Sequence, residues 1–366
     1  MDQEIYMTTH SQARIVKQVR IKGIACAVPT HVQEVAALSD AFGTDEVNKI
    51  ISSTGVERRH VVSEECASDL CVAAAERLIA DLAIDRSTID TLVFVSQTHD
   101  FTLPATACVL QQRLNLPMHT AAFDVALGCS GYVYGMWLAA SLLSGGGSKR
   151  ALLLVGDTIS KIAAPTDRSV AALFGDAGSA TVLEFDPTAP DMPFVLGTDG
   201  RGAKNLIVPA GGYRDRGGMS TQTSEEGVRG PYDLYMNGAE IFAFTLARVP
   251  PLVAALHALD ETGSKPIDHY VFHQANRFML EHLVKKMKLP KEKVVLDVKD
   301  VGNTSCASIP LAISLHQGKA GGYVSGRLML AGFGVGYSWA GCVAEFDQVW
   351  LSPLTITTNF DVKGVL

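Results

Sequence analysis

The chain of 366 residues has 31 basic and 38 acidic side chains, a formal net charge of −7, and no basic block. These values exclude nucleic acid and an anionic membrane surface as main partners, because both require clustered positive charge. Hydrophobic residues make up 47% of the chain, enough to bury the cores of two domains or of one large duplicated domain.

The cysteines and the N-terminal residues predict a cytoplasmic protein. The seven cysteines are an odd number at scattered positions without a Cys-x-x-Cys pair, which argues against a disulfide framework or a zinc site. The first twenty residues lack the apolar centre of a signal peptide, and no apolar stretch approaches the roughly 20 residues that span a bilayer. We expect residues 1–18 to form an N-terminal tail or irregular arm.

From residue 19 onward, apolar strands alternate with segments of helical periodicity. We expect strands at 19–28, 92–95, 121–125, 151–155 and 179–185, and helices at 36–53, 68–82, 104–114 and 132–143. The stretch 209–232, rich in Gly, Ser, Arg and Glu, is long for a connection inside a compact domain. Such a loop is either a functional lid or a disordered insertion.

Two segments of the first half recur in the second half, and these repeats, here called echoes, predict an internal duplication. The run Ile89–Phe94 returns as Ile267–Phe272, at an offset of 178 residues (267 − 89). The segment that leads from Cys129 to the strand ending at Gly156 returns in the segment ending at Gly332, at an offset of 176 (332 − 156). Alternating strands and helices in each copy indicate parallel βαβ units, and hence an α/β sandwich of two similar halves.

Cys129 occupies the turn between a predicted strand and a predicted helix, in Gly128-Cys129-Ser130-Gly131. Unpaired N–H groups at a helix start favour an anion and lower a thiol pKa, and the glycines permit a tight turn. A reactive thiol is therefore one interpretation. A small buried cysteine that packs the junction is the other.

The second copy supplies polar groups at the corresponding strand ends, where open α/β folds bind their ligands. His273 follows one strand, Asn303 lies in the counterpart of the Cys129 turn, and Val335 lies in a glycine-rich strand end. Cys129 could hold an acyl group as a thioester, with its own amide and that of Val335 binding the oxyanion. His273 and Asn303 could stabilise an enolate without a metal. A structural histidine and a capping asparagine remain the alternatives.

With its motifs in this order, the chain resembles β-ketoacyl-acyl-carrier-protein synthase III, a family of the thiolase superfamily. The resemblance runs from about residue 19 to residue 345. It rests on eight stretches: Thr54–Arg59, Gly128–Gly131, Pro165–Arg168, Phe174–Gly178, Met236–Gly238, His273–Asn276, Gly302–Ser305 and Gly332–Trp339.

This resemblance implies a thiolase-like α/β fold, in which a βαβαβαββ unit occurs twice in a five-layer αβαβα sandwich. The N-terminal half, 19–186, would carry the nucleophile Cys129, and the C-terminal half, 187–366, would carry His273 and Asn303, completing a Cys-His-Asn triad. Leu103 would close the acyl pocket of a partner subunit in a homodimer. The channel for pantetheine or CoA would be lined by Arg168, Gly238, Phe242, Ala275 and Asn276.

The implied activity is that of an acyltransferase of fatty acid biosynthesis that needs no cofactor. An acyl thioester loads the cysteine, and a malonyl-type thioester, expected on acyl carrier protein, loses CO₂ and attacks to give a β-ketoacyl thioester. The acyl donor is acyl-CoA or acyl carrier protein. One alternative is transfer of the acyl group to an alcohol or amine in a specialised pathway, without decarboxylation. Another is a non-catalytic paralogue that keeps only the fold.

The chain departs from the family pattern at several positions. Lys49 and Ser53 stand where fatty-acid-initiating members have a tryptophan and an arginine that clamp the CoA adenine, so stacking on the adenine is lost. Phe278 replaces an arginine, with Arg277 beside it, and Val335 replaces a glycine. These departures predict that the protein acts on substrates that differ from those of the fatty-acid-initiating members of the family.

A basic cluster lies late in the second half, at Arg277, Lys285, Lys286 and Lys288. It is either a docking patch for an acidic carrier protein or the solvated face of a helix.

Overall fold

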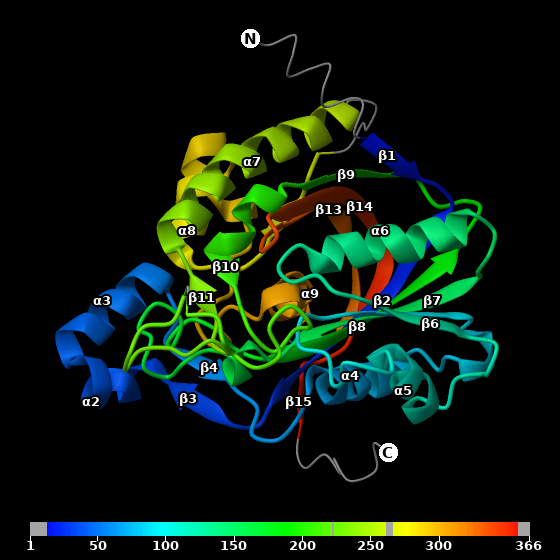
Figure 1. Cartoon of the computed structure of the whole chain (residues 1–366). Coiled ribbons are helices and arrows are strands. Elements are labelled where there is room, and N and C mark those ends of the chain that lie inside the picture. Colours follow the sequence, from blue (N-terminus) through cyan, green and yellow to red (C-terminus); the bar gives the residue numbers. More distant parts are fainter. Residues whose placement is uncertain (1–12, 222, 261–265, 319, 358–366) are drawn as a thin grey trace.

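A computed structural model describes the chain except for residues 1–12, 222, 261–265, 319 and 358–366. Eleven strands form one continuous hydrogen-bonded sheet among the described residues, and it divides into two similar parts (Figure 1). The N-terminal part runs in the order β6 (Ala121–Val125), β5 (Thr91–Val95), β7 (Arg150–Asp157), β8 (Ala177–Phe185) and β2 (Val19–Pro29), with β15 (Thr355–Thr357) beside β2.

The C-terminal part runs in the order β12 (His269–Phe272), β13 (Gly322–Gly334), β14 (Ser338–Leu351) and β9 (Met192–Thr198), which repeats β5, β7, β8 and β2, and β1 (Ala13–Val16) is added outside β9. The counterpart of β6 is a single parallel bridge between Tyr270 and Val294. The two parts meet through β14 and β2, whose parallel pairing covers Trp350 opposite Gly23 and Leu351 opposite Ile24. The strands that the echoes relate, β5 with β12 and β7 with β13, occupy equivalent places. The predicted duplication is therefore visible in the topology.

Helices complete the five layers, which Figure 1 shows from α7 at the top to α4 and α5 at the bottom. The central layer contains α6 (Gly131–Ser144) and α9 (Ser308–Gln317), packed between the two parts of the sheet. The outer helices are α4 (Ala67–Asp81) and α5 (Thr106–Arg113) on one side and α7 (Gly238–Leu259) and α8 (Arg277–Met287) on the other. The predicted α/β sandwich is confirmed.

Short elements connect the long strands and helices of this sandwich. They are η1 (Val35–Leu38), α2 (Ser39–Phe42), α3 (Thr44–Thr54), the paired strands β3 (Val32–Glu34) and β4 (Arg58–His60), the paired strands β10 (Leu206–Ile207) and β11 (Tyr235–Met236), and the 3₁₀ turns η2 (Arg86–Thr88), η3 (Ile159–Lys161), η4 (Gly200–Asn205), η5 (Lys291–Lys293) and η6 (Ser305–Ala307). The single helix predicted at 36–53 is therefore wrong. Gly43 has a φ of +83°, a conformation that few residues other than glycine adopt, and the chain turns there between α2 and α3.

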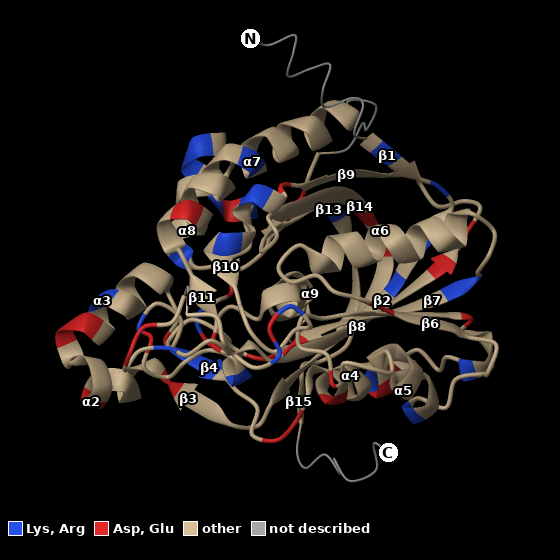
Figure 2. Ribbon diagram, in the orientation of Figure 1, with Lys and Arg blue, Asp and Glu red and all other residues tan. Residues whose placement is uncertain are grey.

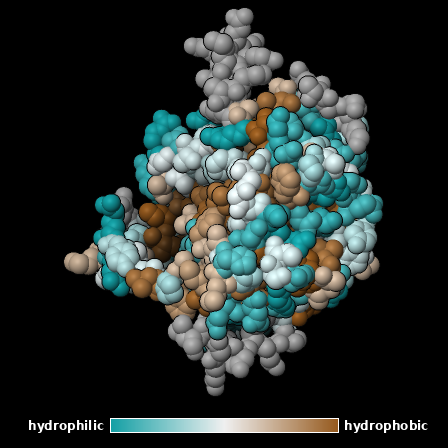
Figure 3. All heavy atoms as spheres, turned by 90° about the vertical axis from the view of Figure 1, so that its right-hand side faces the viewer, coloured by the Kyte–Doolittle hydropathy of each residue, from teal (hydrophilic) through white to brown (hydrophobic). Residues whose placement is uncertain are grey.

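Two further sequence expectations need correction. Residues 13–16, predicted as part of a tail, form β1, which pairs antiparallel with β9. In addition, α7 is by length and composition long enough and apolar enough to cross a membrane, against the expectation that no stretch comes near that length. Its buried residues Val249, Leu252 and Leu256 belong to the core on the C-terminal part of the sheet, so this helix covers a sheet in the folded protein. On the face seen in Figure 3, polar side chains (teal) alternate with small apolar patches and one apolar hollow.

The packing of α4 on β8 yields a test of the fold. A Cβ atom on Gly178 would lie 2.5 Å from the backbone of both Leu70 and Cys71, where no flexible side chain can move aside. We expect Gly178→Ala to lower the free energy of unfolding by about 1–3 kcal/mol through overpacking. Urea denaturation measures the effect, with Gly212→Ala as the control because no atom lies within 4 Å of the added Cβ there. Equal stability of the two variants would contradict this packing.

Candidate active site

Cys129 lies in the turn between β6 and α6 and is only 7% exposed. Its side chain lines a cavity of about 290 Å³. The walls of this cavity are largely apolar and are formed by Gln97, Ile159, Ile162, Phe174, Leu206, Ile207, Val208, Leu234, Ser305 and Val335. The sulfur is therefore at the edge of a chamber suited to an apolar group, and the interpretation of Cys129 as a mere packing residue loses support.

Glycines at the end of β13 allow the two halves of the chain to meet at Cys129. A Cβ on Gly334 would lie 2.8 Å from the Cys129 Cβ and 2.9 Å from its Sγ. A Cβ on Gly332 would lie 2.8 Å from the carbonyl oxygen of Cys129. Because any side chain would fill these gaps, glycine is required for β13 to approach the nucleophile turn.

Burial controls the protonation of Cys129. Desolvation raises the pKa of the thiol to about 11, and the negative charge of Asp157 also raises it. Hydrogen bonds from the Ser305 hydroxyl and from the amides of Val335 and Cys129 lower the pKa by less. The expectation that the helix start lowers the pKa of this thiol is therefore wrong, because burial has the larger effect. The two amides predicted as the oxyanion hole do point at the sulfur.

His273 directly follows β12 and is 2% exposed. Its Nδ1 lies 2.7 Å from the Ser308 hydroxyl, and its ring packs edge-on against Phe333. Burial lowers the pKa of His273 to about 3, and a hydrogen bond to the Ser305 backbone raises it by less. The imidazole is therefore neutral at pH 7 and can donate one hydrogen bond without bringing a positive charge into the chamber.

Asn303 is held by its backbone in the turn before η6. Its amide donates to the Leu173 carbonyl at 2.9 Å, and its carbonyl accepts from the Gly175 amide at 3.1 Å. The side-chain Oδ1 accepts from the Ser305 amide at 2.9 Å, which leaves the Nδ2 group for donation to another molecule. An asparagine that only caps a turn would make the same Oδ1 contact, so this bond does not by itself assign a role.

Ser305 joins the three predicted catalytic residues. Its hydroxyl contacts Cys129, its backbone accepts from His273, and its amide donates to Asn303. The structure thus brings these side chains around one serine, although His273 and Asn303 do not line the cavity itself. Ser305 belongs to the Gly302–Ser305 motif, but its role was not predictable, because a motif does not tell which atoms form bonds.

The residues predicted for the channel lie outside the cavity. Arg168 is largely exposed and pairs with Glu46 at 3.6 Å, and Gly238 begins α7 with open space above its Cα. Phe242 packs against the exposed Phe278, with ring centroids 5.4 Å apart.

The last two channel residues and Leu103 have surroundings of their own. Ala275 is buried, whereas Asn276 caps α8 by accepting from the Met279 amide at 2.8 Å. Leu103 is 74% exposed. These positions are compatible with a channel and a partner contact, and their roles stay predictions.

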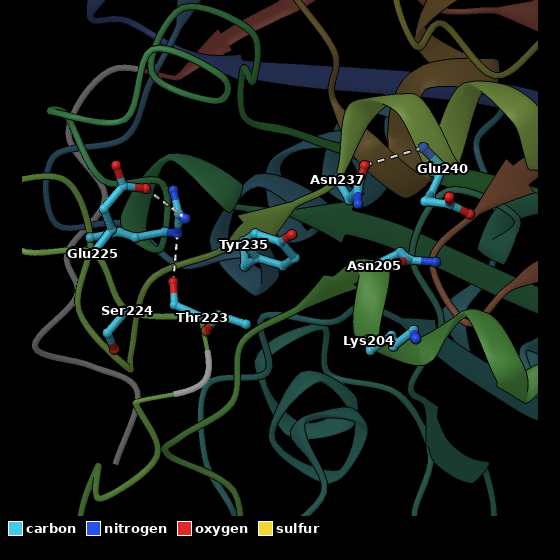
Figure 4. A pocket seen from close by; sticks show the side chains of 9 residues that line it. Lys204, Asn205, Thr223, Ser224, Glu225, Tyr235, Asn237 and Glu240 are labelled. Carbon is cyan, nitrogen blue, oxygen red and sulfur yellow. Dashed lines mark hydrogen bonds and ion pairs between the residues drawn. The ribbon is translucent and has the colours of Figure 1, made fainter.

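A larger cavity of about 560 Å³ lies beside β11, which contributes Tyr235 to its lining (Figure 4). Leu206, Ile207 and Leu234 face the Cys129 cavity, whereas Lys204 and Tyr235 line the larger one. This larger cavity is polar and is lined by Lys204, Asn205, Thr223, Ser224, Glu225, Arg229, Tyr235, Asn237 and Glu240.

Arg229 fastens the described part of the loop 209–232. Its guanidinium donates to the Thr223 carbonyl at 2.7 Å, to Asp167 at 2.9 Å and to Glu225 at 3.0 Å. The Thr166 hydroxyl also donates to the Val228 carbonyl at 2.6 Å. These bonds hold the described part of the loop against the segment Pro165–Arg168.

Comparisons with known proteins agree on one family. A family model described as 3-oxoacyl-[acyl-carrier-protein] synthase III matches residues 123–200, and a model of the C-terminal part of the same enzymes matches 259–346. A relative from Ruegeria pomeroyi, named beta-ketoacyl-[acyl-carrier-protein] synthase III, is 38% identical over 337 residues, 89% of this chain and 98% of the relative.

Solved structures extend this likeness to the fold. The crystal structure of a 3-oxoacyl-(acyl-carrier protein) synthase from Burkholderia xenovorans is 42% identical, with a TM-score of 0.88 over 94% of this chain and 99% of that one. The structure of a 3-oxoacyl-(acyl carrier protein) synthase III from Pseudomonas aeruginosa is 30% identical, with a TM-score of 0.76 over 93% of this chain and all of that one.

The raised pKa of Cys129 predicts a distinct pH profile for alkylation. Because iodoacetamide reacts with the thiolate, the rate at Cys129 should rise about tenfold per pH unit from pH 7 to pH 10, since the pKa is about 11. Peptide mass spectrometry follows Cys129 separately from Cys108, which is exposed. An alkylation rate that levels off below pH 9 would show that the pKa of the Cys129 thiol is not raised.

Proposed function

The chain belongs to the β-ketoacyl-[acyl-carrier-protein] synthase III family, and we propose that Cys129, His273 and Asn303 carry out its reaction. As a member of this family it is an acyltransferase that condenses an acyl thioester with a malonyl-type thioester and releases CO₂. The product is a β-ketoacyl thioester, as in fatty acid biosynthesis. The observation that carries the assignment of residues is the Ser305 turn, which contacts all three side chains.

In the first step the acyl group moves to Cys129. The sulfur attacks the carbonyl carbon of the donor, and the resulting oxyanion is held by the amides of Cys129 and Val335, both directed at the sulfur. The tetrahedral intermediate then expels the thiol of the donor, which leaves with the proton that Cys129 loses. The acyl chain lies along the apolar walls of the cavity, among them Phe174 and Leu206.

In the second step the malonyl-type thioester places its carbonyl oxygen at His273 and Asn303. Breaking the bond to the carboxylate releases CO₂ and leaves an enolate. Its oxygen accepts from Asn303 Nδ2 and from the imidazole N–H, which then donates to the enolate instead of the Ser305 carbonyl. The enolate carbon attacks the thioester on Cys129, and the oxyanion again forms at the two amides. Collapse of this intermediate breaks the carbon–sulfur bond, and the thiolate that leaves takes up a proton from solvent.

The partners follow from the same assignment. The proposed steps use only side chains and backbone amides, so no cofactor enters them. We propose a homodimer in which the exposed Leu103 of one subunit closes the acyl pocket of its partner. We further propose acyl carrier protein as the malonyl carrier, with acyl-CoA or acyl carrier protein as the acyl donor. The seven free cysteines suit the reducing cytoplasm.

Single substitutions separate the two steps. We expect Cys129→Ala to abolish acyl loading, measured by intact-protein mass spectrometry after incubation with a panel of acyl thioesters. His273→Ala and Asn303→Ala should still load but should lower CO₂ release and β-ketoacyl product about 100-fold or more, because each removes a donor to the enolate. His119→Ala, which changes an exposed histidine away from the site, is the control. A Cys129→Ala protein that condenses at the normal rate would refute the assignment, and ester or amide formation without CO₂ would support the alternative chemistry.

The carrier-docking patch is tested on α8, along which basic side chains recur (Figure 2). Lys285 and Lys288 are exposed, whereas Lys286 donates to the Leu246 carbonyl and Arg277 packs over Gly55. We expect Lys285→Glu with Lys288→Glu to slow transfer from acyl carrier protein about 5- to 10-fold and to leave a small pantetheine thioester unaffected, because an acidic partner is repelled. Lys17→Glu with Lys149→Glu, two exposed lysines outside α8, is the charge-matched control. Equal slowing of both substrates would argue against docking at α8.

A further inference from the structure

Asp157 is a buried carboxylate that the proposed steps leave without a role. It is the last residue of β7 and is fully shielded from solvent. Burying a charged carboxylate is strongly unfavourable unless hydrogen bonds compensate for the lost water. The groups that supply those bonds therefore show which parts of the protein depend on it.

One oxygen of Asp157 fixes the turn that follows β5. Oδ1 accepts from the Gln97 amide at 2.7 Å, from the Ser96 hydroxyl at 3.0 Å and from the Thr98 hydroxyl at 3.3 Å. Gln97 lines the Cys129 cavity, and its side chain lies so close to Gly128 that an added Cβ there would be 2.1 Å from Oε1. Asp157 thus fixes the position of Gln97, which forms part of the wall of the Cys129 cavity.

The other oxygen reaches across to the C-terminal half. Oδ2 lies 3.5 Å from the Cys306 amide, directly after Ser305. Ser305 has a φ of +51°, a left-handed conformation that is unfavourable for a serine and persists only when neighbouring contacts enforce it. Asn303 Oδ1 accepts from the Ser305 amide, and Asp157 Oδ2 accepts from the amide of the next residue, Cys306. The serine that contacts Cys129 and His273 is therefore anchored in part by this carboxylate.

The charge of Asp157 also acts on the nucleophile. The titratable groups that face it are the thiols of Cys71 from α4, Cys306 from η6 and Cys129 itself. No ion pair joins it to a basic side chain among the residues that the structure describes. An anion in this position opposes a second negative charge on the neighbouring sulfur.

We propose that Asp157 is a positioning residue that sets the Gln97 and Ser305 turns around Cys129. Both turns border the Cys129 sulfur, and the carboxylate is an anion close to them, so it also acts on the reactivity of the free thiol. The effect on condensation rests on the function proposed above. The effect on the free thiol does not.

The charge is tested with Asp157→Asn, which keeps the shape and one acceptor oxygen but removes the negative charge. We expect alkylation of Cys129 by iodoacetamide at pH 8 to become about tenfold faster, and the pH profile to move down by about one unit. Asp176→Asn is the matched control, because Asp176 is an equally buried carboxylate bonded to Val62 and Ser160. An Asp157→Asn profile identical to that of the wild type, or a control that shifts as far, overturns the charge effect.

The positioning is tested with Asp157→Ala and with the double variant Ser96→Ala, Thr98→Val, which removes two donors and leaves the carboxylate in place. We expect the ratio of condensation rate to loading rate to fall about tenfold in a folded variant, together with a higher KM for the malonyl thioester. If Asp157→Ala does not fold, the ratio of condensation rate to loading rate is measured on the double variant alone. An unchanged ratio overturns the positioning role. A wild-type protein that loads no acyl thioester but shows the alkylation shift would refute the proposed function and leave the effect on the thiol standing.

Discussion

The geometry of the site depends on the contact between two turns, one from each half of the chain. The Cys129 turn packs against the end of β13, where Gly332 and Gly334 leave no room for even a methyl group. The Ser305 turn, the counterpart in the second half, completes the contact with hydrogen bonds to Cys129 and His273. Since each turn begins or precedes a central helix, α6 or α9, the duplicated fold itself brings the reacting groups together.

The same burial gives the site its chemical character. It raises the pKa of Cys129 and lowers that of His273, so the resting pair is a neutral thiol and a neutral imidazole. A thiolate–imidazolium pair, which a cysteine hydrolase would use, is disfavoured in such surroundings. Neutral donors suit the stabilisation of an enolate, because they bind the growing negative charge without protonating it in advance. The electrostatics thus favour condensation over hydrolysis.

Much of the fold was predictable from the sequence, because apolar periodicity is a local property that reports strands and helices directly. The position of β5 and its echo β12 followed from this pattern. What failed depended on distant partners: residues 13–16 become β1 only because β9 lies beside them, and the thiol pKa follows burial that no spacing reveals. Of the site, the residue types were predictable, whereas the bonds of Asp157 and Ser305 join segments up to 176 positions apart (305 − 129) and needed coordinates. The catalytic roles themselves stay predictions.

The anchoring of the loop 209–232 has a mechanical consequence. Arg229 and Asp167 form a nearly buried ion pair, and such pairs are difficult to break because each charge would lose its partner. Asp167 is adjacent in the chain to Arg168, which the sequence resemblance assigns to the channel. Breaking this ion pair would therefore release both the described part of the loop and the segment that holds Arg168.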